Sequence, residues 1–89
     1  MNKPVFENLK EEVLAKEYGS VLQDCATYEK RISMIKEYIS TRKLGAESLM
    51  LCFHDMNKYQ EELDKCNEKR REVEDRISLK IFVDAMAAI

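Results

Sequence analysis

The sequence predicts an all-α protein, a long antiparallel two-helix hairpin of coiled-coil type that turns at Leu44–Ala46. Three observations predict this fold. Charged residues make up 36% of the chain, whereas there are only two glycines and one proline, a composition typical of long helices. Apolar residues recur at alternating steps of three and four on both sides of Gly45. A signal that ends one helix and starts another separates the two periodic stretches.

The first helix is expected over about residues 4–43. Asn2 can cap it, and Pro4 is tolerated in the first turn because its missing amide would have no helical partner there. From residue 18 onward the apolar side chains form one stripe, which we call the seam. In this helix the seam consists of Tyr18, Val21, Cys25, Tyr28, Ile32, Ile35 and Ile39.

Gly19 is the weak point of the first helix. Ser20 and Gln23 resemble a capping box, which would start a new helix directly after the glycine. Against this, a single glycine costs only about 1 kcal/mol in a helix interior. We therefore expect a continuous or bent helix, with a break at Gly19 as the alternative.

The turn is expected over residues 44–47. Arg42 and Lys43 place positive charge where the C-terminus of a helix carries partial negative charge. Gly45 can adopt the left-handed conformation that ends many helices. Glu47 then suits the first turn of the next helix.

The second helix is expected over about residues 48–87, and its seam pairs with that of the first. Folding about the turn places residue i opposite residue 91 − i, so that Cys25 faces Cys66 and Val21 faces Arg70. Arg70 is the one polar interruption; its stem would pack on Val21 while its guanidinium reaches Asp24 or Glu17. The alternative is a polar layer that fixes the register. The apolar seam residues are Leu49, Cys52, Met56, Tyr59, Leu63, Cys66, Val73 and Ile77.

Composition limits the classes of protein. The 89 residues suit one domain over 1–89, and the net charge of −2 gives no reason to expect an anionic membrane or nucleic acid. We find no signal peptide and no apolar run near the roughly 20 residues that span a bilayer. Three cysteines form no disulfide framework, which favours a reducing compartment. We therefore expect a cytoplasmic protein.

Residues with catalytic or metal-binding chemistry are few. Cys52 and His54 stand two apart, so they point to different sides of a helix. The sequence has no Cys-x-x-Cys or His-x-x-x-His pair and no glycine-rich phosphate loop. We expect no enzyme, no cofactor, no metal and no small-molecule substrate.

Apolar residues near the two chain ends lie outside the seam. Leu79–Ile89 is apolar nearly all round, and a helix of that kind must be buried. Either the first helix breaks at Gly19 and folds across the tip, or a second hairpin or a partner helix covers this end. We favour association, because a small core often needs it. The predicted interface comprises Phe6, Leu9, Val13, Leu79, Phe82, Val83, Met86 and Ile89.

These patterns predict a non-enzymatic protein–protein interaction module: a small helical adaptor, a chaperone-like co-chaperone or an assembly subunit. It would bind a protein partner or associate with itself, with a dimeric helical bundle as the expected assembly. The alternative is a nucleic-acid-associated regulator that uses the basic cluster Lys65–Arg71 after dimerisation. Acidic residues interrupt that cluster, so a phosphate would meet little net positive charge.

Overall fold

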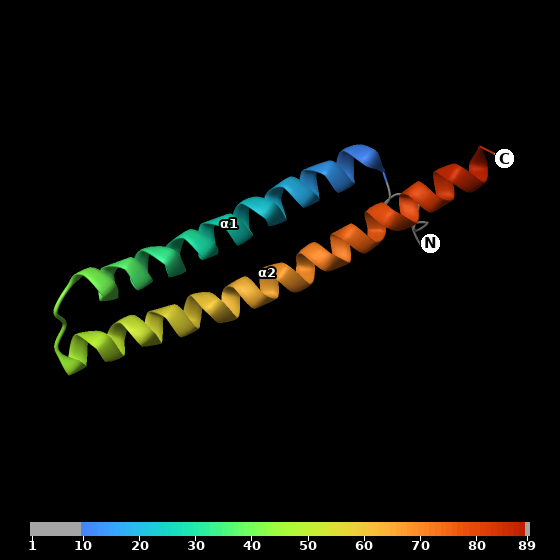
Figure 1. Ribbon diagram of the computed structural model, residues 1–89. Coiled ribbons are helices and arrows are strands. Elements are labelled where there is room, and N and C mark those ends of the chain that lie inside the picture. Colours follow the sequence, from blue (N-terminus) through green and yellow to red (C-terminus); the bar gives the residue numbers. More distant parts are fainter. Residues whose placement is uncertain (1–9, 89) are drawn as a thin grey trace.

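The computed structural model describes residues 10–88 and contains two helices, α1 (Glu11–Thr41) and α2 (Ala46–Ala87) (Figure 1). They lie side by side and antiparallel, and a short connection joins them at one end. The result is an extended hairpin with dimensions of 65 × 27 × 15 Å. The predicted all-α antiparallel hairpin is confirmed.

Helix α1 runs without interruption through Gly19. A Cβ atom built at this glycine would meet no atom within 4 Å, so packing inside the hairpin does not require a glycine here. The helix stays intact because Leu14 and Val21, on either side, are both buried against α2. The continuous helix is therefore confirmed, and a break at Gly19 is wrong. The helix begins later than the expected start near residue 4, because Lys10, with φ −64° and ψ 132°, is extended and precedes α1 as its N-cap; residues 1–9 lie outside the described residues.

The turn differs in detail from the prediction. Helix α1 ends at Thr41 and α2 begins at Ala46, each two residues earlier than expected. Gly45 has φ −70° and ψ 164°, so the expected left-handed conformation is wrong. The connection is extended, and Gly45 precedes α2 as its N-cap, where its carbonyl accepts a hydrogen bond from the Leu49 amide at 3.0 Å. The Arg42 guanidinium lies 4.5 Å from the centroid of the Tyr38 ring.

The core follows the predicted seam as a single row between the helices. Every seam residue from Tyr18 to Ile77 is buried or half-buried, and Val73 is completely buried. A two-helix hairpin has only this one row to bury, so its hydrophobic core is thin. The buried apolar residues are Leu14, Val21, Cys25, Ile32, Leu63 and Val73.

Contacts across the hairpin confirm the predicted register. The Tyr18 hydroxyl donates a hydrogen bond to Glu74 Oε2 at 2.9 Å. The Cys25 thiol donates to Asn67 Oδ1 at 3.7 Å. Each partner stands one residue from the position that the pairing of i with 91 − i predicts. The alternating steps of three and four therefore fixed both the seam and the alignment of the helices.

Arg70 does not form the ion pair that its position suggested. Glu17, one of its two expected partners, instead binds Arg76 across the hairpin. The position opposite Glu17 is two residues from Arg76 and four residues from Arg70. Arg76 is therefore the nearer of the two arginines to the carboxylate. Arg70 is half-buried, and its Nε has no hydrogen-bond partner among residues 10–88. The expected pairing with Asp24 or Glu17 is thus wrong.

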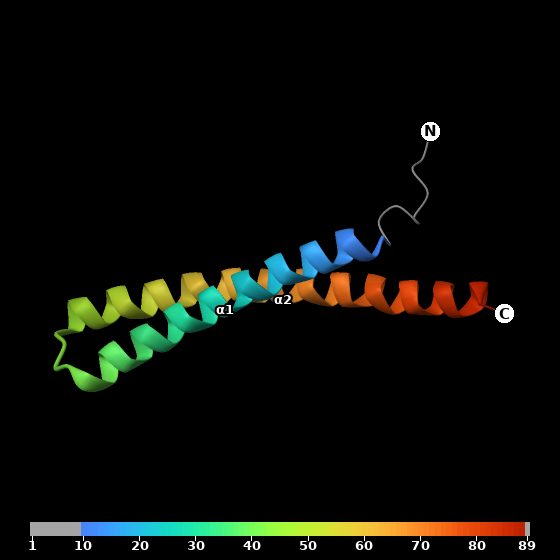
Figure 2. The ribbon, with the colours of Figure 1, turned by 90° about the horizontal axis from the view of Figure 1, so that it is seen from above.

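Helix α2 is longer than α1, with 42 residues against 31. By the observed register, Glu11 at the start of α1 stands level with Lys80. The last turns of α2 therefore extend past the first turn of α1 (Figure 2). We call this overhang, together with the turns of both helices at the level of Glu11, the open end of the hairpin.

Candidate protein-interaction surface

Five of the eight predicted interface residues lie in the described part of the chain. Leu79, Phe82 and Met86 are exposed, with 43%, 62% and 57% of their surface accessible. Val13 and Val83 are half-buried. The other three residues, Phe6, Leu9 and Ile89, lie outside the described residues.

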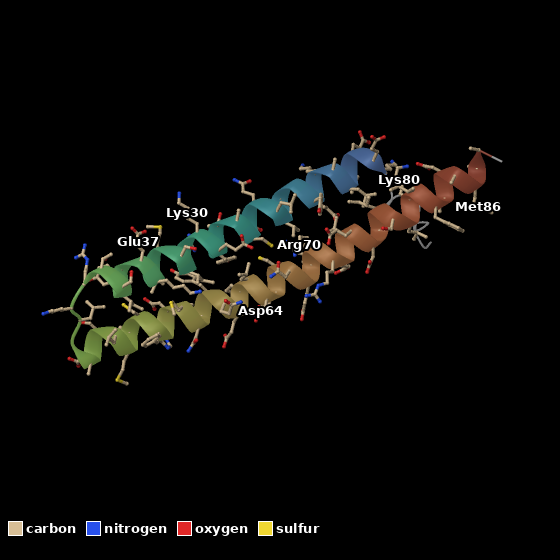
Figure 3. All side chains as sticks on the ribbon, in the orientation of Figure 1. Lys30, Glu37, Asp64, Arg70, Lys80 and Met86 are labelled. Carbon is tan, nitrogen blue, oxygen red and sulfur yellow. The ribbon has the colours of Figure 1, made fainter. Side chains whose placement is uncertain are left out.

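The last turns of α2 bring the exposed apolar side chains together. Leu79, Phe82 and Met86 follow one another at steps of three and four, so they share one face of the helix. That face is turned away from the seam, and Met86 projects beyond the start of α1 (Figure 3). We call Leu79, Phe82, Val83 and Met86 the open-end surface.

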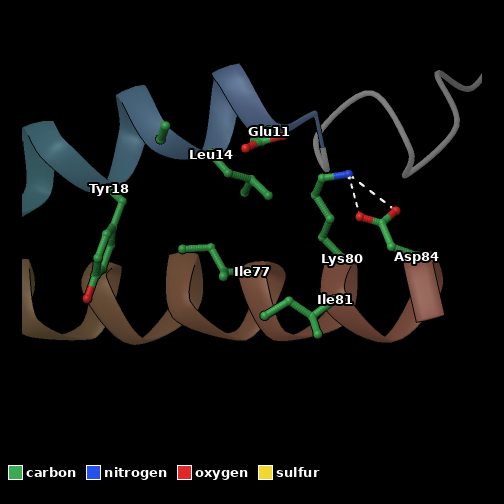
Figure 4. A pocket seen from close by; sticks show the side chains of 8 residues that line it. Glu11, Leu14, Tyr18, Ile77, Lys80, Ile81 and Asp84 are labelled. Carbon is green, nitrogen blue, oxygen red and sulfur yellow. Dashed lines mark hydrogen bonds and ion pairs between the residues drawn. The ribbon is translucent and has the colours of Figure 1, made fainter.

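A hollow of about 360 Å³ lies between the first turns of α1 and the last turns of α2 (Figure 4). Leu14 from α1 and Ile77 from α2 point toward one another across it, and Ile81 extends the apolar wall. Lys80 and Asp84 form an ion pair of 3.1 Å beside it. Glu11 also lines the hollow, but Leu14, Ile77 and Ile81 give it apolar walls that suit an apolar side chain.

A second group of exposed apolar residues lies near the turn, where the sequence analysis predicted no interface. Met50 and Leu51 are 71% and 65% exposed, and Met34 and Phe53 are also exposed. Met50 and Leu51 line a shallow hollow of about 440 Å³ beside His54. The signal was present in the sequence, since these residues fall outside the seam just as Leu79 and Phe82 do.

Ionisable groups along the seam show two shifts. The hydrogen bond to Glu74, with some desolvation, raises the pKa of the Tyr18 hydroxyl above 10.0. Burial, and then the neighbouring Cys25, raises the pKa of the Cys66 thiol above 9.0. Both shifts favour the protonated form of the side chain, so neither group is activated as a nucleophile. Among residues 10–88, no three His, Cys, Asp or Glu side chains are placed to hold a metal ion.

The basic cluster Lys65–Arg71 presents no single basic face. Lys65 lies 3.6 Å from Glu62 in an ion pair, and Arg70 is directed into the seam. Lys69 and Arg71 are exposed, but they stand two residues apart and so point to nearly opposite sides of the helix. No helix in the described part of the chain is long and apolar enough to cross a membrane.

Comparison of the chain with protein-family models, with curated proteins and with solved structures found no match. The exposed apolar residues of this extended hairpin are consistent with a binding partner.

Proposed function

We propose that this chain is a non-enzymatic protein-interaction module that binds a protein partner through its open-end surface. One observation carries the proposal: Phe82 and Met86, on a single face of the last turns of α2, are each more than half exposed. Monomeric proteins rarely leave large contiguous apolar patches of this kind in water. The sequence places Phe6, Leu9, Val13 and Ile89 near the same end, where we include them in the interface.

The expected partner is an apolar face of a helix. Past Lys80, α2 has no described segment of α1 beside it, so a helix from another protein can pack there. The steps of three and four between the exposed residues match ridges-into-grooves packing. Each side chain that becomes buried contributes roughly 1.5–3 kcal/mol to binding. The Lys80–Asp84 pair neutralises two of the three charged side chains that line the hollow, and the third is Glu11.

The nucleic-acid alternative has no comparable support. Its cluster, Lys65–Arg71, is divided between the seam, an ion pair with Glu62 and two separate sides of α2. A phosphate backbone requires several cations on one surface. This arrangement of the cluster therefore disfavours binding of nucleic acid.

Affinity capture with a paired control tests the proposed function. Tagged wild-type chain, Phe82→Glu and Met34→Glu would be used to retain proteins from the source cell. Met34 is as exposed as Phe82, 59% against 62%, but lies on α1 toward the turn, so it controls for the added charge. We expect wild type and Met34→Glu to retain the same partner and Phe82→Glu to lose it, because the substitution would bury an unpaired carboxylate. Equal retention by Phe82→Glu would rule out the open-end surface as the binding site.

A further inference from the structure

The two broad faces of the hairpin differ in composition. On one of them, Cys25 bonds to Asn67, and Ala15 and Ile81 line one hollow from opposite helices (Figure 4). Residues at multiples of seven from these positions lie on the same side, which adds Leu22 and Phe53. Ala26 follows Leu22 by one turn. We call this side, defined by Ala15, Leu22, Ala26, Phe53, Asn67 and Ile81, the Leu22 face.

Apolar residues on the Leu22 face remain in water. Leu22 is 40% exposed although it lies midway along α1, well away from either end of the hairpin. Phe53 near the turn is 49% exposed, and Ile81 near the open end is 65% exposed. Small exposed residues, Ala15 and Ala26, flank Leu22 and leave room for another helix to approach closely. No described segment of the chain covers this face.

The positions on this face are symmetric about one level of the hairpin. Phe53 and Ile81 stand fourteen residues before and after Asn67. In α1, Leu22 and Ala26 stand two residues before and after Asp24, which the register places level with Asn67. In α1 the mirrored position of Leu22 thus holds the small Ala26, and in α2 the mirrored position of Phe53 holds the apolar Ile81.

We infer that a second copy of this chain packs antiparallel on the Leu22 face, with a two-fold axis at the level of Asn67, to form a four-helix bundle. In this arrangement α1 packs on α1 of the second copy and α2 on its α2. Leu22 then meets Ala26 of the second copy, and Phe53 meets Ile81. A two-fold interface contains each such contact twice, so the Leu22–Ala26 and Phe53–Ile81 contacts each occur twice in the dimer.

The hollow at the open end fits this arrangement. Its volume is about 360 Å³, and Leu14, Ile77 and Ile81 supply apolar walls. An apolar cavity of about 150 Å³ is large enough for a benzene ring. The two-fold axis brings Phe53 of the second copy to the level of Ile81, so its ring can enter the hollow. The turn end of each copy thus fills the open end of the other.

Charges on the Leu22 side are complementary under the same two-fold axis. Glu12 and Lys36 stand twelve residues before and after Asp24, so each carboxylate meets the ammonium group of the second copy. Asp64 and Arg71 lie on the same side of α2 at nearly mirrored positions about Asn67. All four side chains are exposed in the hairpin, with surface free for such pairs. Opposite charges at mirrored positions fix both the register and the antiparallel orientation.

The opposite broad face lacks this complementarity. Lys65 and Lys69 stand two residues before and after Asn67, so the same two-fold axis on that side would place lysine against lysine. Glu62 and Glu72 stand five residues before and after it, which would place glutamate against glutamate. Like charges facing one another oppose association. Charge therefore selects the Leu22 face from the two broad faces.

The available area is sufficient for a stable dimer. The broad face measures about 65 by 27 Å. Contact over half of that rectangle buries about 900 Å² per copy, and a standard interface buries about 800 Å² per partner. This inference does not depend on the proposed function, because the dimer leaves Phe82 and Met86 uncovered at each end of the bundle.

Molar mass in solution, measured by light scattering on the full chain, tests the dimer. We expect about 21 kDa for wild type, twice the 10.5 kDa of one chain. Leu22→Glu should halve the mass while circular dichroism still shows a helical chain, since Leu22 is not among the buried core residues. Leu51→Glu, an equally drastic change at an exposed residue outside the Leu22 face, should remain dimeric. A monomeric wild type, or a dimeric Leu22→Glu, overturns the inference.

Disulfide cross-linking tests the face and the orientation even if Leu22→Glu does not fold. Phe53→Cys combined with Ile81→Cys should give a bond between positions 53 and 81 of different copies, identified by peptide mass spectrometry. Leu51→Cys with Val83→Cys is the matched control, because these positions are mirrored about Asn67 but lie off the Leu22 face. Cross-linking of the control pair alone, or bonds between two copies of position 53, overturns the arrangement. If Phe82→Glu alone makes the chain monomeric, the copies join at the open-end surface and the Leu22 face is not the interface.

Discussion

Cys66 shows how the seam changes the chemistry of a single residue. Burial in the seam raises the pKa of its thiol above 9.0, and the adjacent Cys25 adds to the shift. A raised pKa means that the folded chain holds the thiol proton more tightly than the unfolded chain does. The resulting contribution to stability is complete below pH 9.0 and is lost as the pH rises through the higher pKa of the folded state.

The same shift predicts slow alkylation of Cys66. The thiolate is the reactive form, and a raised pKa leaves less of it at a given pH. At pH 8 we expect iodoacetamide to modify Cys66 more slowly in the folded chain than in urea, as measured by peptide mass spectrometry. The difference should shrink as the pH is raised. Equal rates in the folded and unfolded chains at pH 8 would show that Cys66 is not held in the seam.

Oxidation of Cys25 and Cys66 tests the register at one layer of the seam. Both residues are free thiols that face one another across the seam. Mild oxidation of dilute protein should yield an intramolecular disulfide with little loss of helical circular dichroism, because bonded cysteines need Cβ atoms only about 4 Å apart. Cys52 serves as the internal control, since the register places it level with Ile39 and away from both thiols. A bond that involves Cys52 instead would disprove the pairing.

Helix α1 offers a test at the scale of an element. Gly19 lies inside a continuous helix, and a Cβ atom there would meet open space. Gly19→Ala should therefore raise the free energy of unfolding by about 0.5–1 kcal/mol, because alanine loses less backbone entropy in a helix. Urea denaturation measures the change. A loss of stability would indicate that another chain approaches the glycine closely.

Most of the architecture of α1 and α2 was predictable from the spacing of apolar residues. From Tyr18 to Ile77, the steps of three and four predicted which side chains are buried, and the alignment of Cys25 with Cys66 followed from the position of the turn. Helix periodicity is a local property that the sequence carries directly. This is why the seam and register are confirmed although no similar protein was found.

The errors arose where a residue had several competing partners. Gly45 is suited to ending α1 or to preceding α2, and its own type does not distinguish the two. Glu17 stands near both Arg70 and Arg76, and only the three-dimensional arrangement shows that Arg76 reaches it. The exposed group near Met50 was not predicted, although Met50 and Leu51 fall outside the seam. Spacing shows that a residue is outside the seam, but not whether another segment covers it.

The whole molecule exposes more surface than a compact monomer. Its accessible surface is 7326 Å², whereas a compact protein of 10.5 kDa exposes about 5,400 Å². Its radius of gyration is 19.3 Å, against about 12 Å for a compact chain of this length. Six buried apolar residues form the core among residues 10–88. A core of this size gives only marginal stability, so association should supply part of it.

The dependence of thermal stability on protein concentration tests this account most directly. Association stabilises the folded state by mass action, whereas the melting temperature of an isolated monomer does not depend on its concentration. Melting would be followed by circular dichroism at 222 nm over a hundredfold range, from about 1 to 100 μM. We expect the melting temperature of the wild-type chain to rise with concentration and that of Leu22→Glu to stay constant and lower. A cooperative wild-type transition at one temperature across the whole range would contradict the account, since the thin core of a single hairpin would then be sufficient for folding.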